Sequence, residues 1–161
     1  MQKEFVGQYL HTWRVFTRLV NGFDDYAWIH TGRNTTTPVR LSLHILQATK
    51  YYIEDHSTTN FISGKAFDMD SATAKEDDLP SRNDILSSID ALSKKTGKWL
   101  TEIDYRSKNE AFPWAGKTNL GVVIFLLRHS LYHLGELSSL LNESKNGNVE
   151  DNYVKALAEN S

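Results

Sequence analysis

Residues 121–141 read GVVIFLLRHSLYHLGELSSLL, a stretch that is apolar on nearly every side when it is wound into a helix. A helix without a fully polar face belongs at the centre of a domain or at an interface. Three further segments carry apolar residues at helical spacing, and none of the chain alternates as a strand does. The sequence therefore predicts an all-α domain in which the helix over about 118–142 packs against three others.

The other predicted helices have recognisable faces or ends. One spans about 3–22, and the next begins with Thr37 as N-cap and Pro38 as first residue and ends near residue 56. A third begins after Ser81, where Asp84 can complete a capping box, and continues to about residue 103. The first of these helices has an apolar face made of Phe5, Tyr9, Trp13, Phe16, Val20 and Phe23.

The link over residues 57–80 is long, polar and rich in turn formers. A long link favours a crossover that lets the two helices it joins run in the same direction. We therefore expect a four-helix bundle in up-down-down-up order, with the crossover between the second and third helices. The bundle domain is expected to cover residues 1–145. The tail, residues 146–161, is expected to be a short helix or frayed.

Composition narrows the class of protein. The 161 residues carry 18 basic and 20 acidic side chains in a well-mixed order, which argues against nucleic-acid binding. No apolar run reaches the ~18 residues of a membrane span, and the first residues lack the order of a signal peptide. Without cysteine there is neither a disulfide nor a protein thiol nucleophile. A cytoplasmic protein with no membrane or nucleic-acid partner is expected.

Two histidines four residues apart, His129 and His133, lie on one stripe of the last predicted helix. Imidazoles at this spacing can bind one metal ion, and the best third ligand is His44 within the second helix. Gln47 and Tyr51 share the stripe of His44 and are expected beside the site. Three imidazoles leave a coordination position open, where a metal can activate water or polarise a substrate.

Glu136 follows His133 by one turn and has three possible roles: orienting a histidine, acting as a base, or joining the coordination shell. Metal binding is one of two interpretations of these histidines. A histidine pair of this kind can also be structural, with each imidazole hydrogen-bonded to a neighbour in a metal-free bundle. No metal role is expected for His11 or His30. His56 could be a substitute ligand, but it lies three turns from His44.

These residues resemble the DinB/YfiT-like superfamily over about residues 5–142. The resemblance lies in a histidine of the second helix followed by HSLYHLGEL at 129–137, together with LPSR at 79–82 and FPW at 112–114. It implies a four-helix bundle holding a divalent metal, often zinc or nickel, on His44, His129 and His133. Leu43 stands where many members have tryptophan, and Glu136 where many have glutamine, which leaves the subfamily and the substrate open.

The resemblance implies either a hydrolase or a transferase that uses a low-molecular-weight thiol. The expected function is therefore a metal-dependent enzyme that activates water or a small thiol against a small-molecule substrate. The alternative is a non-catalytic, metal-stabilised dimeric scaffold. A homodimer would cover the second apolar face of the last helix, which consists of Leu120, Ile124, Leu127, Leu131 and Leu134.

Overall fold

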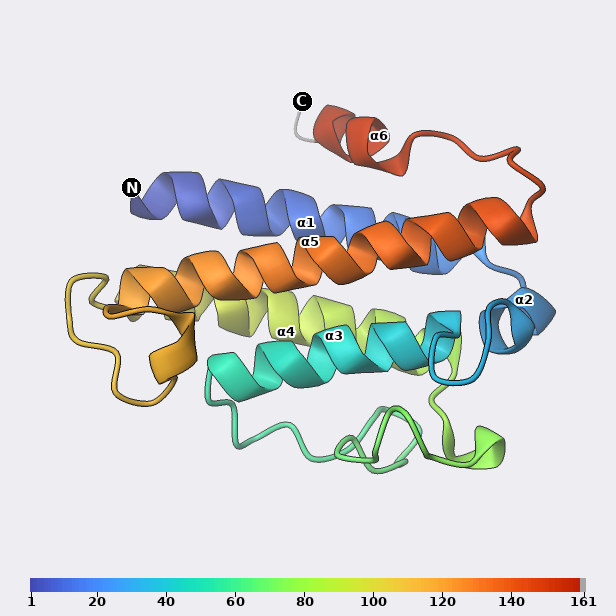
Figure 1. The fold of residues 1–161 in the computed structure, drawn as a ribbon, viewed down its shortest axis with the longest axis horizontal. Coiled ribbons are helices and arrows are strands. Elements are labelled where there is room, and N and C mark those ends of the chain that lie inside the picture. Colours follow the sequence, from blue (N-terminus) through green and yellow to red (C-terminus); the bar gives the residue numbers. More distant parts are fainter. Residues whose placement is uncertain (160–161) are drawn as a thin grey trace.

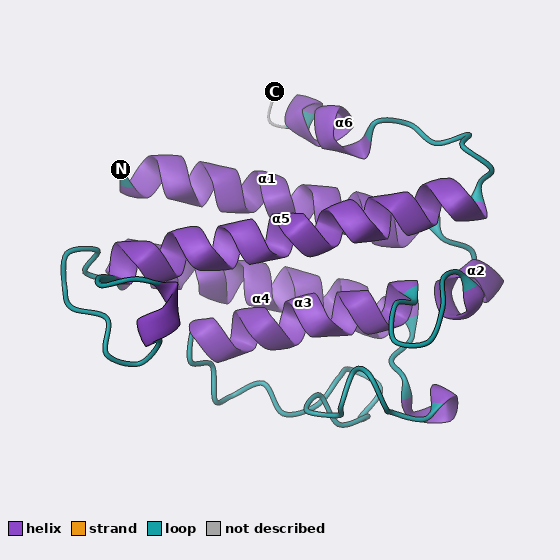
Figure 2. Ribbon diagram, viewed as in Figure 1, coloured by secondary structure: helices purple, strands orange, loops and turns teal. Residues whose placement is uncertain are grey.

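The computed structural model describes residues 1–159, and within this range the chain is all-α with no strand (Figures 1 and 2). Only isolated bridges interrupt the loops, for example between Asn60 and Ala66. None of the helices in the described range is both long and apolar enough to cross a membrane. The elements are α1 (Gln2–Gly22), α2 (Asp25–His30), α3 (Pro38–Tyr52), the 3-10 turn η1 (Glu76–Asp78), α4 (Arg82–Glu102), the 3-10 turn η2 (Pro113–Ala115), α5 (Asn119–Ser144) and α6 (Asn152–Ala158).

Four long helices, α1, α3, α4 and α5, lie side by side and enclose the core (Figure 1). α1 contacts α4 and α5, and α3 contacts the same two helices. Each of the four therefore packs against two neighbours, and α5 joins α1 to α3. The largest fully buried side chains come from all four helices, from the residue that follows α1 and from the link after α3; they are Phe16, Leu19, Phe23, Leu43, Ile45, Leu46, Phe67, Ile85, Leu92, Leu100, Leu126 and Leu137.

Helix α3 ends at Tyr52, four residues earlier than the sequence indicated. Glu54 adopts a left-handed conformation with φ of 54°, and the Asp55 N–H donates to the Lys50 carbonyl at 3.0 Å. A left-handed residue with this bond is the usual way a helix terminates, although glycine normally occupies the position. No glycine marked the stop in the sequence, so His56 lies beyond the helix rather than near its end.

The predicted capping box of α4 is confirmed. The Asp84 N–H donates to Ser81 Oγ at 3.1 Å, and the Asp84 carboxylate accepts the Ser81 N–H at 3.0 Å. The other oxygen of Asp84 accepts the Ser63 N–H at 2.9 Å. The cap therefore also fixes the end of the long link against α4. Thr37, by contrast, occupies the N-cap position of α3 without a side-chain cap bond.

Short helix α2 was not predicted, because six residues are too few to show a helical period. The sequence feature that could have indicated α2 is Asp24, an N-cap residue whose carboxylate accepts the Ala27 N–H at 2.8 Å. The link from 53 to 81 is ordered although it has little regular structure. Arg40 of α3 donates to the carbonyls of Ser71 and Ala74 at 2.9 and 2.8 Å and holds the link against the helix.

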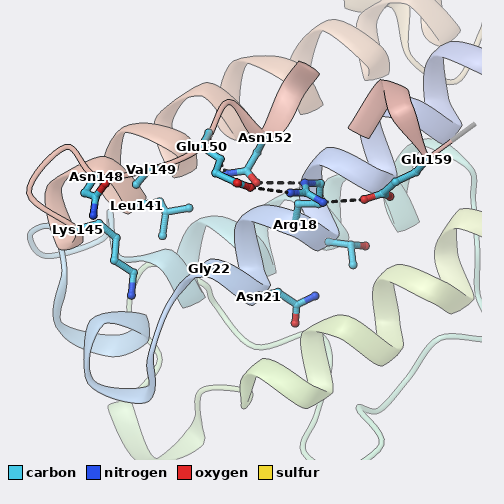
Figure 3. A pocket seen from close by; sticks show the side chains of 11 residues that line it. Arg18, Asn21, Gly22, Leu141, Lys145, Asn148, Val149, Glu150, Asn152 and Glu159 are labelled. Carbon is cyan, nitrogen blue, oxygen red and sulfur yellow. Dashed lines mark hydrogen bonds and ion pairs between the residues drawn. The ribbon is translucent and has the colours of Figure 1, made fainter. Parts of the chain in front are cut away.

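The tail does contain a helix, α6, which packs on α1. Ala156 is fully buried there, and Arg14 donates to its carbonyl oxygen at 3.1 Å. Arg18 binds Glu159 at 2.7 Å and Glu150 at 3.4 Å, next to a cavity of about 470 Å³ between α1, the end of α5 and the tail (Figure 3). Exposed ion pairs of this kind stabilise little, so the buried Ala156 is the main anchor of the tail.

We expect Ser81→Ala to lower the free energy of unfolding by about 1 kcal/mol, because it removes the acceptor that caps α4. Urea unfolding followed by circular dichroism measures the change. Ser139→Ala, at an exposed position within α5, is the matched control and should leave stability unchanged or slightly raised. Equal effects of the two substitutions would contradict a structural role for the cap.

Candidate metal centre

Three histidines from two helices converge in the structure. His44 lies on α3, whereas His129 and His133 lie one turn apart on α5. One nitrogen from each ring lies within 4.8 Å of the others. Within residues 1–159 this is the only such group of histidine, aspartate and glutamate ligand atoms. The contact between α3 and α5 thus assembles the set that the spacing of the histidines predicted.

The separation of the ring nitrogens matches a shared ion. His44 Nε2 and His129 Nε2 are 3.2 Å apart. Two ligand nitrogens at about 2.0–2.1 Å from a tetrahedral zinc ion are about 3.3–3.4 Å apart, because the angle between them is near 109°. The same 3.2 Å also allows one ring N–H to donate to the other ring. The distance therefore fits both a metal and a direct hydrogen bond.

Glu136 is the hydrogen-bond partner of His133. The His133 Nδ1–H donates to Glu136 Oε2 at 2.6 Å. Fixing the proton on Nδ1 leaves Nε2 with its lone pair, which is the form that coordinates a metal. Of the three roles open to Glu136, the structure places it in the geometry of an orienting partner. Its carboxylate does not belong to the group of converging ligand atoms.

His129 is the most poorly partnered of the three imidazoles. Its Nδ1 is buried and has no hydrogen-bond partner among residues 1–159, and the Phe125 ring stacks on it at 6.4 Å. A buried polar atom without a partner is rare in a folded protein. Because Nε2 faces only another imidazole, the ring relies on that single neighbour for polar contact. A metal ion on Nε2 would give this ring a stronger polar partner than the neighbouring imidazole, but it would leave Nδ1 without one.

The environment keeps two of these imidazoles neutral. Burial lowers the pKa of His44, and the nearby His133 lowers it further, against an opposing effect of Glu136. Burial, with His133 and His44 beside it, lowers the pKa of His129 from 6.5 to about 4. Neutral imidazole is the metal-binding form, so no proton has to be removed from either ring near neutral pH.

Gln47 and Tyr51 lie beyond the histidines along α3. The Gln47 amide donates to the carbonyls of Phe67 at 2.9 Å and Met69 at 2.6 Å, which attaches the link to the helix. Tyr51 is 55% exposed and packs against Phe112. Both line a cavity of about 450 Å³, and in the described range neither is hydrogen-bonded to a histidine of the group. Their cofactor-binding role remains a prediction.

Sequence reasoning did not identify the aromatic wall that connects the histidines to this cavity. The ring of Phe125 on His129 also packs on Tyr52 at 5.3 Å, and Tyr52 packs on Phe112 at 5.0 Å. The Trp114 indole N–H donates to the Tyr52 hydroxyl at 2.9 Å. The FPW motif at 112–114 carried part of this signal, but only the fold brings its loop beside the end of α3.

The remaining histidines lie outside the converging group. His11 Nε2 is 2.9 Å from the Tyr153 carbonyl oxygen and ties α1 to the tail. His30 belongs to α2 rather than to a loop, and its ring lies 4.5 Å from that of Tyr26. His56 lines the cavity beside Tyr51.

No protein-family model matches this chain, and no curated protein or solved structure is detectably similar to it. The DinB/YfiT-like resemblance therefore rests on the short motifs and on the three histidines. It remains a prediction.

We expect the metal-free protein to lose stability as the pH is lowered from about 6.5 to about 4. In the unfolded chain His129 takes up a proton near its ordinary pKa of 6.5. In the folded chain the pKa of His129 is about 4, so protonation requires a lower pH. As the pH falls through this range, protonation therefore stabilises the unfolded state and lowers the free energy of unfolding. Urea midpoints measured with chelator at pH 7.5 and pH 5 test this. His129→Gln should reduce the difference between the two pH values, and an undiminished difference would contradict the assignment.

Proposed function

We propose that this protein is a metal-dependent enzyme in which His44, His129 and His133 hold a divalent metal ion, with zinc or nickel as the first candidates. The observation that carries the proposal is the convergence of three ring nitrogens within 4.8 Å. Imidazole suits both metals, so the donor set by itself does not select between them. When bound, such an ion lowers the pKa of a coordinated water or thiol and polarises a substrate.

The chain's own residues would prepare this chemistry. Glu136 keeps the proton of His133 on Nδ1 through a 2.6 Å hydrogen bond and so leaves Nε2 with the lone pair that can bind a metal. Its carboxylate is partly exposed, and the proposal also gives it the task of accepting a proton from the nucleophile or substrate. The apolar ring of Phe125 stacks on the His129 ring and would cover that face of it.

The nucleophile would come from outside the protein. The chain has no cysteine, so a thiol would have to be supplied as a low-molecular-weight cosubstrate. Water is the alternative nucleophile. The two cases correspond to a thiol S-transferase and a hydrolase, and both act on a small-molecule substrate.

Metal content tests the proposal. Protein made without a histidine tag should contain about one equivalent of metal by elemental mass spectrometry, either as purified or after reloading with zinc or nickel. His44→Ala and His133→Ala should both lose it, because each removes one of three ligands. His30→Ala, which lies outside the converging group, is the matched control and should retain full metal content. A metal-free wild type after reloading would overturn the proposed site.

The alternative function is a metal-stabilised dimeric scaffold, and the outer face of α5 favours it. Ile124 and Leu131 on that face are 46% and 38% exposed, whereas Leu134 is buried and Leu120 and Leu127 are half-buried. Only part of the predicted second face is therefore open to a partner. A metal-loaded protein that is inactive in both ester hydrolysis and thiol transfer would support the scaffold.

A homodimer on this face predicts that Leu131→Glu dissociates the protein, since it would bury a carboxylate in an apolar contact. Sedimentation velocity at tens of micromolar protein should show a dimer for wild type and a monomer for the variant. Ile62→Glu, an equally drastic change at an exposed position of the link, should leave the dimer intact. A monomeric wild type would exclude the homodimer at these concentrations.

We also infer the up-down-down-up order for the four long helices. The support for it is the ordered link between α3 and α4, which follows these helices in Figure 1, together with the contact of α3 with α4. A link of this length permits two neighbouring helices to run in the same direction.

A further inference from the structure

A cavity of about 450 Å³ opens beside the histidines, at the end of α3. It is bounded by the last turn of α3, the link that follows, and the loop before α5; its lining includes Gln47, Tyr51, Glu54, Asp68 and Phe112. The size suits a small organic molecule. His44, His129 and His133 do not line it, but Gln47 follows His44 by three residues, which is about 4.5 Å along the helix axis. A molecule in the cavity could therefore extend toward the three-histidine group.

Of the carboxylates that line this cavity, one is not in an ion pair with a described residue. Lys50 binds both oxygens of Asp68 at 2.8 Å, and Lys95 binds Asp55 at 2.7 Å. These two pairs are neutral overall. Glu54 makes no ion pair within residues 1–159, so the lining carries a surplus negative charge. The backbone turn that ends α3 holds Glu54 at the rim.

Two aromatic residues line the same cavity as that carboxylate. The rings of Tyr51 and Phe112 lie 5.3 Å apart with an angle of 59° between their planes. Tyr51 is more than half exposed, so its ring remains available to a ligand. Aromatic faces attract ammonium groups, and the attraction adds to that of a nearby carboxylate. Phe112 is buried and packs against Tyr51, so the exposed ring of Tyr51 is the aromatic surface open to a cation.

The wall that carries Phe112 is fixed before any ligand arrives. Asn109 is buried, and its side-chain amide donates to the carbonyls of Phe112 at 2.5 Å and Gly116 at 2.8 Å. Its oxygen accepts the Phe112 N–H at 2.9 Å. A preformed wall loses little conformational freedom on binding, which favours affinity for a small ligand.

Two other ligand classes fit this cavity poorly. An anion would meet Glu54 and would find Lys50 already occupied by Asp68. A metal ion would need converging ligand atoms, but His56, Glu54, Asp55 and Asp68 form no group of three within 4.8 Å. An organic cation, whose charge is spread over several atoms, does not need converging ligand atoms.

We propose that this cavity binds an organic ammonium ion, with its charged end on the exposed ring of Tyr51 and paired with the Glu54 carboxylate, which lines the same cavity. The inference rests on the proposed function only where it takes the bound cation to be the substrate of the metal centre. Binding itself requires only the described residues of the cavity.

The test is a titration of the metal-free and the metal-loaded protein with choline, followed by two-dimensional NMR. The neutral isostere 3,3-dimethyl-1-butanol is the matched probe, since it has the same shape without the charge. Choline should shift the amide signals of Tyr51, Glu54 and Phe112, and the alcohol should bind at least roughly fivefold more weakly. Glu54→Gln should weaken choline binding by roughly fivefold or more, whereas Glu143→Gln near the end of α5 should have no effect.

Glu54→Gly separates binding from folding. It removes the carboxylate and also places glycine at the left-handed position, so it should raise the melting temperature while weakening choline binding. Equal affinity for choline and the alcohol, or unchanged choline binding in Glu54→Gln, would overturn the inference. Choline binding in a protein that takes up no metal would leave the cavity assignment standing and remove only the proposed enzyme. Metal uptake without choline binding would do the reverse.

Discussion

The contact between α3 and α5 brings the candidate site together. Apolar side chains of both helices are buried in the common core, with Leu43 and Leu46 on α3 and Leu126 and Leu137 on α5. That burial fixes the two helices relative to each other, so His44 faces a histidine 85 residues further along the chain at 3.2 Å. A rigid core on both sides maintains ring positions that a loop would not hold.

The same packing explains the chemistry of the three rings. Partial burial lowers the pKa of His44 and His129, and the neutral rings it produces are the form in which imidazole binds metals. Glu136 supplies the one strong hydrogen bond in the group and directs His133. The aromatic wall through Phe125, Tyr52 and Phe112 then continues from the histidines to the cavity at the end of α3. The three-histidine group and the cavity thus share one side of α3.

The elements around these helices mostly hold loops in place. Arg40, Gln47 and Asp84 each bond the link after α3 through its backbone. Backbone groups of an irregular segment need such partners when they cannot pair in a helix. Asn109 does the same for the loop before α5. Polar side chains that resemble site residues in the sequence can therefore have a structural task, as the Gln47 amide does.

Local rules in the sequence were enough to place the four long helices, the capping box of α4 and the histidine pair, because helical period and caps depend on residues within a few positions of one another. They failed at α2, which is too short to show a period, and at the end of α3, where a left-handed glutamate replaces the usual glycine. The partnership of His44 with His129, the hydrogen-bonded state of Gln47, and the cavity bounded by three separate segments depend on long-range packing. Such contacts follow from how the whole core closes, and no short stretch of sequence contains that information.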